Sequence, residues 1–344
     1  MNTIVLKPKD LLNIDHYNNI RSVLLEGGLV VFPTETVYGI GANALDPKAA
    51  KQIYSVKGRP IDNPLIVHIA SMEQLPKLVT SISETAKTLM NVFWPGPLTL
   101  IFEKSEIIPK EITGGLDTVA IRFPSNKIAQ KVIEAAGVPI CAPSANISGR
   151  PSSTLFEHVF SDLDGKVDII IDGGKSTIGL ESTVLDLTST VPSILRPGAV
   201  TKKMIEDVLG SNVEDGFLEH LEDAPKSPGM KYTHYAPKGK ITLVYGEKEN
   251  VIFYMNQQVA LHSNQAVGVI CATEYLEDIL CEHKIALGGL DDPNEVASNI
   301  FIALRKMDEL QIEQIYAHAF SNADLGSAIM NRLLKAAGYN VIYV

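Results

Sequence analysis

Residues 57–68 read KGRPIDNPLIVH and set a cationic segment directly before a short apolar run. The run PLIV at 64–67 has the length and composition of a strand in the interior of a sheet. Lys57 and Arg59 precede this run, Asn63 adjoins it and His68 follows it. Polar loops at strand ends are a usual place for ligands in folded proteins. The stretch therefore predicts a core strand with a candidate binding site beside it.

Around this strand, the first 210 residues contain many strand-like runs and fewer, unevenly spaced helical patterns. An unequal mixture of this kind indicates an α+β fold or a mixed sheet. The predicted strands lie at 29–32, 64–70, 97–103, 118–123, 138–144, 167–172, 182–187 and 193–196. The predicted helices lie at 15–26, with Asp15 as the N-cap, and at 47–56, 83–94, 126–137 and 201–210.

From residue 240 onward, apolar runs alternate with helical patterns, which predicts a small parallel α/β domain. Gly288-Gly289 lacks the further glycine and helix that a dinucleotide-binding loop requires. The intervening residues 211–239 begin with acidic side chains and continue with Pro, Gly and charge, a composition that by itself indicates a solvated tether. The predicted organisation is a first domain at 1–210, a linker at 211–239 and a second domain at 240–344.

The chain has 344 residues, 45% of them hydrophobic, and a formal net charge of -10. This length supports one large domain or two ordinary ones, and the charge excludes a general attraction to nucleic acid or anionic membranes. The three cysteines, Cys141, Cys271 and Cys281, form no C-x-x-C pair, which argues against a disulfide framework or a cysteine zinc site. No apolar stretch approaches the roughly 20 residues of a membrane span, so we expect a cytoplasmic protein without a membrane partner.

Polar side chains gather at the predicted strand ends, and four of them are the cations Lys57, Arg59, Arg122 and Arg196. If these cations converge, they form a local pocket for a polyanion such as a triphosphate. The alternative is that each pairs with a nearby carboxylate at the surface. In the same way, the ordinary interpretation of His68, alone on an apolar strand, is a core histidine.

Several familiar chemistries are excluded by their missing motifs. The segment GKST at 174–177 resembles the end of a P-loop, but Ile169 stands where the first glycine is required. The chain has no G-x-S-x-G nucleophile elbow and no H-E-x-x-H metal helix. A site of cations, hydroxyls and backbone groups suits nucleotidyl or phosphoryl transfer with magnesium, because that catalysis is largely positioning and charge neutralisation.

The pair Lys57-x-Arg59 together with Ser144-x-Asn146 resembles the K-x-R and S-x-N signature of the threonylcarbamoyl-AMP synthase family, the YrdC-like proteins. Five further blocks resemble those of the family in the same order: FPTETVYGIGANA (32–44), WPGPLTLIF (94–102), VAIRFP (119–124), GLESTVLDL (179–187) and ILRPGAV (194–200). The motif KYTHYAP (231–237) and the region after it resemble the long, two-domain form. The resemblance implies a YrdC-like twisted mixed sheet with helices and a concave site, followed by a small Rossmann-like parallel domain.

The resemblance implies an enzyme that converts L-threonine, bicarbonate and ATP to L-threonylcarbamoyl-AMP, pyrophosphate and water. This is the first step in forming threonylcarbamoyladenosine in tRNA. Mg²⁺ would be carried by the ATP phosphates with no side-chain ligand. The product would pass to a tRNA-modifying threonylcarbamoyl transferase complex, and direct tRNA binding by this chain would be weak or absent.

The resemblance also implies roles for individual residues. It assigns ATP to Lys57, Arg59, Asn63, Thr118, Ser144, Ser152, Arg196 and Tyr235, and L-threonine to Thr34, His68, Arg122, Ala142 and Ser182. The catalytic residues would be Lys57, Arg59 and Ser144 of this set together with Asn146, which would lie near the phosphates or the metal. The linker would close over the active site and bring Tyr235, and with it His234, to the nucleotide.

Two other functions compete with this interpretation. One is an RNA-binding module without catalysis, whose affinity would fall steeply with salt. The other is carbamoyl-adenylate chemistry on another substrate, as in larger hydrogenase-maturation proteins, although nothing here resembles their acylphosphatase and zinc-finger modules. If Lys57 and Arg59 serve a ligand and not the core, Lys57→Ala and Arg59→Ala should abolish activity with little loss of stability.

Overall fold

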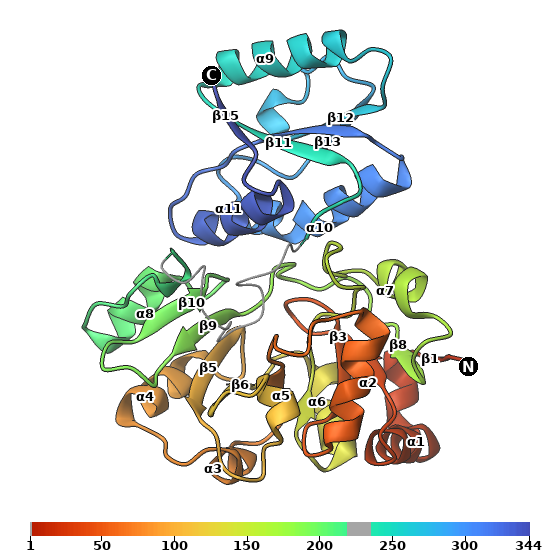
Figure 1. Cartoon of the computed structure of the whole chain (residues 1–344), viewed down its shortest axis with the longest axis vertical. Helices are drawn as coiled ribbons and strands as arrows, with labels where there is room; N and C mark the ends of the chain where they lie inside the picture. The colour runs from red at the N-terminus through yellow and green to blue at the C-terminus, as the bar shows by residue number, and fades with distance from the viewer. Residues whose placement is uncertain (1, 219–234) are drawn as a thin grey trace. The chain divides into compact units, whose positions relative to one another are not determined.

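The computed structural model of the chain describes residues 2–218 and 235–344 (Figure 1). Within these residues the chain forms two compact units. The first contains 2–148, 153–177 and 181–218, and the second contains 149–152, 178–180 and 235–344. Two short segments from the first 210 residues, 149–152 and 178–180, are therefore grouped with the carboxy-terminal region.

The first unit is built on a mixed ten-stranded sheet in the order β1-β8-β2-β3-β7-β4-β6-β5-β9-β10. Its central strand β4 runs parallel to β6 on one side and antiparallel to β7 on the other. The strands are β1 (Ile4–Leu6), β2 (Val30–Phe32), β3 (Gly39–Asn43), β4 (Ile66–His68), β5 (Leu98–Glu103), β6 (Thr118–Arg122), β7 (Ile140–Cys141), β8 (Ile169–Ile171), β9 (Thr183–Asp186) and β10 (Ser193–Arg196).

Helices complete the core of this unit. They are α1 (Ile14–Leu25), α2 (Pro47–Lys57), α3 (Leu75–Leu78), α4 (Glu84–Phe93), α5 (Lys110–Thr113), α6 (Lys127–Ala136), α7 (Phe156–Leu163) and α8 (Lys202–Leu209), with 3-10 turns at Pro8–Leu12, Met72–Gln74 and Gly216–Leu218. Leu24 of α1 and Ile133 of α6 are fully buried in one apolar cluster with Phe32 of β2. A second and larger cluster takes in the buried residues of α2 and α4. These helices hold the short central strands, and therefore the residues at their ends, in place.

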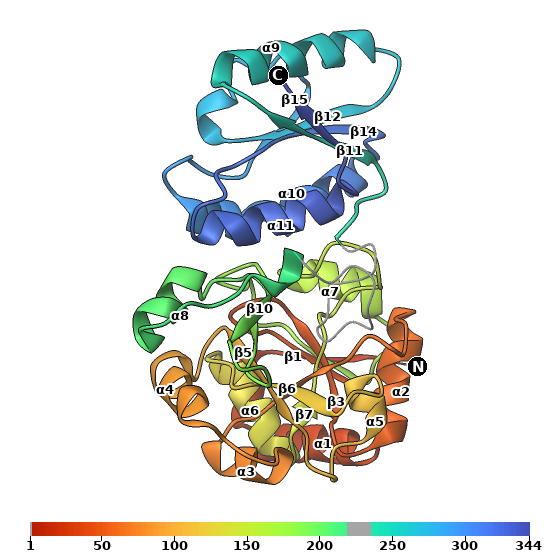
Figure 2. The same ribbon diagram turned by 60° about the vertical axis from the view of Figure 1, so that its left-hand side comes forward.

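The second unit is a five-stranded sheet in the order β13-β12-β14-β11-β15, and every pairing in it is parallel. Its elements are β11 (Lys240–Tyr245), α9 (Lys248–Leu261), β12 (Val267–Cys271), a 3-10 turn (Thr273–Tyr275), β13 (His283–Ala286), α10 (Pro293–Glu309), β14 (Gln314–His318), α11 (Leu325–Ala336) and β15 (Val341–Tyr343). Helix α9 covers one face, while α10 and α11 pack side by side on the other (Figure 2). The predicted fold class, a mixed sheet followed by a small parallel α/β domain, is confirmed.

Some local predictions differ from the structure. Asn13, not Asp15, caps the first helix, because the Asn13 side chain accepts the Asp15 backbone N–H at 2.7 Å. Strand β3, with sequence GIGAN, was not predicted because two glycines interrupt its apolar pattern. Strand β1 and helix α7 were also not predicted. In the part of the chain that the structure describes, no helix is long and apolar enough to cross a membrane.

Candidate active site

Lys57 links the K-x-R segment to the S-x-N segment. It is the last residue of α2, and Gly58 ends the helix in the left-handed conformation with φ 61°. The Lys57 ammonium group donates to the carbonyl oxygens of Ser144 and Asn146. The Ser144 hydroxyl in turn donates to Asn146 Oδ1 at 2.5 Å. Since Lys57 is only 1% exposed, its charge is buried against the S-x-N loop.

Arg59 is held by the loop that leads into β4. Its Nη2 donates to Asn63 Oδ1 at 2.6 Å and to the Pro64 carbonyl oxygen at 3.0 Å. Its Nε donates to the Asn63 carbonyl oxygen at 3.3 Å. Arg59 and Asn63 are both buried. The guanidinium group is therefore oriented by the backbone of residues 63 and 64, and a shift of that backbone would move it.

Three polar residues lie in one row across the central strands. The parallel register of β4 and β6 pairs His68 with Arg122, and the antiparallel register of β6 and β5 pairs Arg122 with Thr99. Residues paired across neighbouring strands point to the same face of a sheet. His68, Arg122 and Thr99 therefore share one face, and all three are buried.

Ser182 and Arg196 extend this row toward β10. The Ser182 hydroxyl lies 2.7 Å from the Thr99 hydroxyl. Arg196 donates from Nε to the Ser182 carbonyl oxygen at 3.0 Å and from Nη2 to the Ser182 hydroxyl at 3.1 Å. The structure thus brings together residues that the sequence assigned separately, Ser182 to threonine and Arg196 to ATP.

Glu35 lies at this site and is outside the predicted set, as are its neighbours Thr36 and Thr99. Its Oε1 accepts a hydrogen bond from Arg122 Nη2 at 2.6 Å, and both side chains are buried. Burial alone would raise the pKa of Glu35, but the charge and hydrogen bond of Arg122, with backbone hydrogen bonds, lower it below its ordinary value. Its position between Thr34 and Thr36 in the block FPTET was the available signal. The carboxylate is therefore ionised and balances the buried charge of Arg122.

The surroundings of His68 define its protonation. Its Nδ1 lies 3.0 Å from the Ile66 carbonyl oxygen, which also accepts the Ala142 backbone N–H at 2.9 Å. A carbonyl oxygen only accepts hydrogen bonds, so Nδ1 carries the hydrogen and Nε2 is a bare acceptor. Burial and the nearby charge of Arg122 lower the pKa of His68 to about 3. The ring is therefore neutral, with one free lone pair.

Thr34 shapes the turn after β2. Its hydroxyl donates to the Val37 carbonyl oxygen at 2.6 Å and lies 2.8 Å from the Thr36 hydroxyl. Arg122 Nη1 donates to the Thr36 hydroxyl at 2.8 Å. The Thr34 oxygen also accepts the backbone N–H groups of Thr36 at 3.1 Å and of Val37 at 3.2 Å, so its hydrogen bonds hold this turn in place.

Thr118 and Arg122 stand at opposite ends of β6. Between them on the same face lies Ala120, which is buried in a small apolar cluster with Ile66 of β4 and Ile101 of β5. Thr118 was predicted to bind ATP and Arg122 to bind the substrate L-threonine. An apolar patch of the sheet therefore separates these two predicted ligands.

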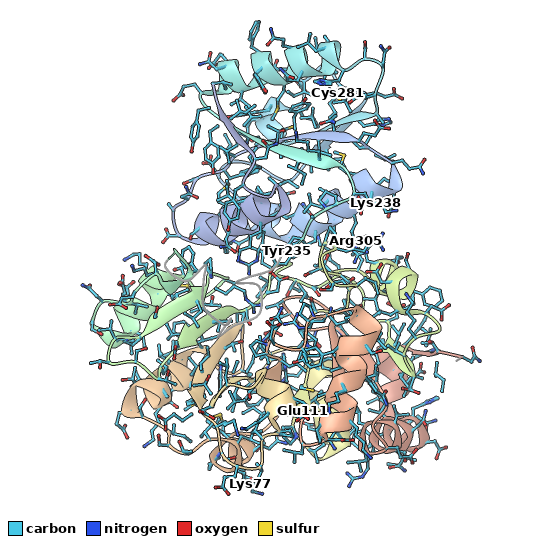
Figure 3. All side chains as sticks on the ribbon, in the orientation of Figure 1. Lys77, Glu111, Tyr235, Lys238, Cys281 and Arg305 are labelled. Atoms are coloured by element: carbon cyan, nitrogen blue, oxygen red, sulfur yellow. The ribbon has the colours of Figure 1, made fainter. Side chains whose placement is uncertain are left out.

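Two of the predicted ATP residues, Ser152 and Tyr235, are grouped with the second unit. Tyr235, which is labelled in Figure 3, has a left-handed backbone with φ 66°. Its ring centroid lies 5.2 Å from that of Phe301. The Arg332 guanidinium lies 5.7 Å from the centroid of the Tyr235 ring. Of the linker at 211–239, residues 219–234 and hence His234 lie outside the described residues.

The S-x-N loop lacks the side chains of a metal site held by the protein alone. Among residues 2–218 and 235–344, no three His, Cys, Asp or Glu side chains gather in a way that could hold a metal ion. The loop instead offers the neutral oxygens of Ser144 and Asn146. Such a set fits a magnesium ion that arrives with phosphates more than an ion held by the protein alone.

Comparison with known proteins identifies the class. A family model described as "Telomere recombination" matches residues 22–198, and one described as "Threonylcarbamoyl-AMP synthase, C-terminal domain" matches residues 200–338. The threonylcarbamoyl-AMP synthase of Pyrococcus abyssi is 47% identical over 99% of this chain and 100% of its own length. That of Bacillus subtilis is 46% identical over 93% of this chain and 92% of its own length.

A solved structure is similar along the whole chain. The crystal structure of P. abyssi Sua5 complexed with L-threonine has a TM-score of 0.92 and 46% identity, and the match covers 100% of both chains. The chain described here is thus an enzyme of the nucleotidyltransferase type. It belongs to the threonylcarbamoyl-AMP synthase family, whose members are transferases of tRNA modification.

Proposed function

We propose that this chain synthesises L-threonylcarbamoyl-AMP from L-threonine, bicarbonate and ATP, and releases pyrophosphate and water. The observation that carries the proposal is the row of buried polar residues on one sheet face, in which two arginines, His68 and Ser182 meet. The related P. abyssi protein, which has been solved in complex with L-threonine, supports the choice of amino acid.

L-threonine is assigned to the carboxyl ends of β4 and β6. Three of the five N–H groups of the Arg122 guanidinium donate to Glu35, Thr36 and the Gly96 carbonyl oxygen. The other two suit the bidentate geometry of the substrate carboxylate. The bare Nε2 of His68 suits the ammonium or hydroxyl group of threonine. Thr34, Ser182 and the backbone at Ala142 complete the proposed threonine set.

ATP is assigned to the K-x-R and S-x-N segments. Arg59, Lys57 and Arg196 supply positive charge, while Asn63, Thr118, Ser144 and Ser152 supply hydrogen bonds. Asn146 is placed near the phosphates or their Mg²⁺. Charge builds on the phosphoryl oxygens in the transition state, so fixed cations and the metal carried by ATP would contribute most to catalysis. The proposed catalytic residues are Lys57, Arg59, Ser144 and Asn146.

The chemistry has two bond-forming steps. The amine of threonine attacks carbon dioxide or bicarbonate, loses a proton and becomes a carbamate, with water released when bicarbonate is used. A carbamate oxygen then attacks the α-phosphorus of ATP, and the bond to pyrophosphate breaks. The resulting mixed anhydride is sensitive to water, so exclusion of solvent would protect it.

The linker is the proposed means of that exclusion. Closure of 211–239 over the nucleotide would bring Tyr235, and with it His234, to ATP. Tyr235→Ala should then raise the KM for ATP while leaving the first unit folded. Unchanged ATP affinity and turnover in that variant would contradict the closure.

Beyond this chain, the product would be consumed by a complex that transfers the threonylcarbamoyl group to adenosine in tRNA. We propose that the chain itself binds tRNA weakly or not at all, because its net charge is -10. A cytoplasmic location is part of the same proposal.

The decisive experiment is a pyrophosphate-release assay from which L-threonine, bicarbonate and ATP are omitted in turn. We expect release to depend on all three substrates. Release that is unaffected by omission of threonine would overturn the proposed function. Replacement of L-threonine by L-serine and by L-valine then tests which features of the amino acid the site requires.

A further inference from the structure

Gly114 lies against the backbone of the loop that orients Arg59. It follows α5, has a left-handed backbone with φ 61° and donates its N–H to the Lys110 carbonyl oxygen. A Cβ atom at this position would stand 2.7 Å from the Asp62 carbonyl oxygen, 3.0 Å from the Asp62 carbonyl carbon and 3.4 Å from the Pro64 nitrogen. These are backbone atoms, so the contact could be relieved only by a shift of the backbone, at residues 62–64 or at Gly114 itself.

That short stretch of backbone carries every contact described above for the Arg59 guanidinium. The three hydrogen bonds run to the side chain of Asn63, to its carbonyl oxygen and to the carbonyl oxygen of Pro64. Asn63 is itself one of the residues proposed to bind ATP. A displacement transmitted from Gly114 would therefore move two proposed ATP ligands at once.

Helix α5 holds the same loop at two further points. The Leu65 N–H donates to the Ile112 carbonyl oxygen at 2.8 Å. The Tyr54 hydroxyl of α2 lies within hydrogen-bond distance of two carbonyl oxygens, that of Asn63 at 3.2 Å and that of Glu111 at 2.9 Å. Glu111 is marked on α5, close to α2, in Figure 3. The loop is thus braced from the side of α5.

The loop borders open space on one side. A pocket of about 360 Å³ is lined by Ile61 and Asp62 of the loop together with Tyr54, Gly114 and Gly115. Ile61 is 73% exposed. Ile61 therefore adds little packing to the loop, whereas a Cβ atom at residue 114 would press directly on the loop backbone.

We infer that Gly114 is a positioning residue for the nucleotide site: its lack of a side chain lets α5 brace residues 62–64 and so set the Arg59–Asn63 pair. This inference rests on the proposed function, because it takes Arg59 and Asn63 to be ATP ligands. It extends the site to a residue that lies outside both signature motifs.

Gly115 provides a matched control. It is the next residue, has a left-handed backbone with φ 89°, and a Cβ atom there would meet nothing within 4 Å. Gly114→Ala and Gly115→Ala therefore share the backbone strain of a positive φ, but only the first displaces the loop. Tyr54→Phe is a milder variant, since it adds no bulk and removes the hydroxyl that lies between the Asn63 and Glu111 carbonyl oxygens.

The experiment measures KM for ATP and for L-threonine in the pyrophosphate-release assay, with calorimetric titration of MgATP and of L-threonine as a second readout. For Gly114→Ala we expect the KM for ATP to rise about 10- to 100-fold, as for a misplaced binding group, with the KM for threonine within about 2-fold. For Gly115→Ala both constants should stay within about 2-fold.

Equal effects of the two alanine variants, or an equal rise in both KM values for Gly114→Ala, would overturn the inference. If Gly114→Ala does not fold, the KM values of Tyr54→Phe test the inference instead. We expect its KM for ATP to rise about 2- to 10-fold and its KM for threonine to stay unchanged. A wild-type chain that binds ATP but releases no pyrophosphate would contradict the proposed function and leave the comparison of ATP binding between variants intact.

Discussion

Arg122 Nη2 and Glu35 Oε1 form a 2.6 Å ion pair whose two side chains are 5% and 9% exposed. The pair joins the end of β6 to the turn after β2, two segments far apart in the sequence. A buried charge is stable only when it is paired and hydrogen-bonded. Glu35 is therefore required to keep Arg122 folded inside the protein and directed at the proposed threonine site.

Glu35→Gln should lower the folding stability at neutral pH and make that stability less dependent on pH in the acid range. The pKa of Glu35 is lowered on folding from its ordinary value of 4.5, so its contribution is present above that value and is lost as the pH falls through the folded pKa. The chain has one tryptophan, Trp94, which lies in the first unit, so its fluorescence follows the thermal unfolding of that unit between pH 3 and 7.

The control for this experiment is Glu84→Gln, which removes an exposed carboxylate paired with Lys87. That change should leave the midpoint temperature of unfolding, and its dependence on pH, nearly as in the wild type. Exposed ion pairs contribute only about 0–1 kcal/mol to stability. If the stability of the Glu35→Gln protein falls with pH as that of the wild type does, the buried pair does not govern the loss of stability in acid.

Lys57→Ala should remove both activity and stability. The burial of Lys57 changes the expectation from sequence of little loss of stability, because its ammonium group serves two carbonyl oxygens of the S-x-N loop. Removing the donor leaves buried acceptors without that partner, and we expect a loss of about 2–4 kcal/mol in the free energy of unfolding.

Urea unfolding followed by Trp94 fluorescence measures this loss. Lys51→Ala is the control, because Lys51 lies on the same helix with a side chain that is 64% exposed and an ion pair to Glu111. We expect that variant to change the free energy of unfolding by about 0.5 kcal/mol or less. Equal stabilities of the two variants would disprove a role for Lys57 in holding the S-x-N loop.

His68→Ala should weaken threonine binding without introducing or removing a pH step near neutrality. The pKa of His68 is lowered to about 3, so the ring is neutral throughout the range from pH 6 to 8 and acts as an acceptor only. Loss of one hydrogen bond to a charged group corresponds to a rise of about 10- to 100-fold in the KM for threonine. A step near pH 6.5 in the wild-type KM that His68→Ala abolishes would refute the neutral form.

His318→Phe should stabilise the second unit. His318 is 4% exposed and its Nδ1 has no hydrogen-bond partner among the described residues. Its ring is tilted against two aromatic rings, with centroid distances of 4.4 Å to Tyr275 and 4.8 Å to Phe320. Phenylalanine keeps the aromatic contacts and removes the unpaired polar atom, which should add about 1 kcal/mol.

The acid dependence of this unit tests the same prediction. Burial lowers the pKa of His318 from 6.5 to about 4, so the wild-type unit should lose stability as the pH falls from 6.5 toward 4, and the variant should not. Hydrogen exchange of the β14 amides reports the change. His262→Phe, at a half-buried ring whose Nδ1 contacts the Gln258 carbonyl oxygen, should not reproduce the gain.

Long apolar patterns predicted the fold well, and short or irregular segments did not. The strands at 97–103 and 118–123 were predicted from apolar runs and correspond to β5 and β6. Strand β3 and helix α7, which were not predicted, depend on neighbours more than on their own composition. A short segment gains most of its stability from tertiary packing, so its sequence carries a weak local signal.

The sequence by itself determined the motifs, their order and therefore the family, because these are properties of residue identity. Only the tertiary structure showed that Lys57 is bound to the S-x-N carbonyls and that Glu35 neutralises Arg122. It alone set the tautomer of His68 and the contact of Gly114 with Asp62. Hydrogen bonds, ion pairs and pKa values depend on distances between residues remote in sequence, and those distances are decided by the packing of the sheet.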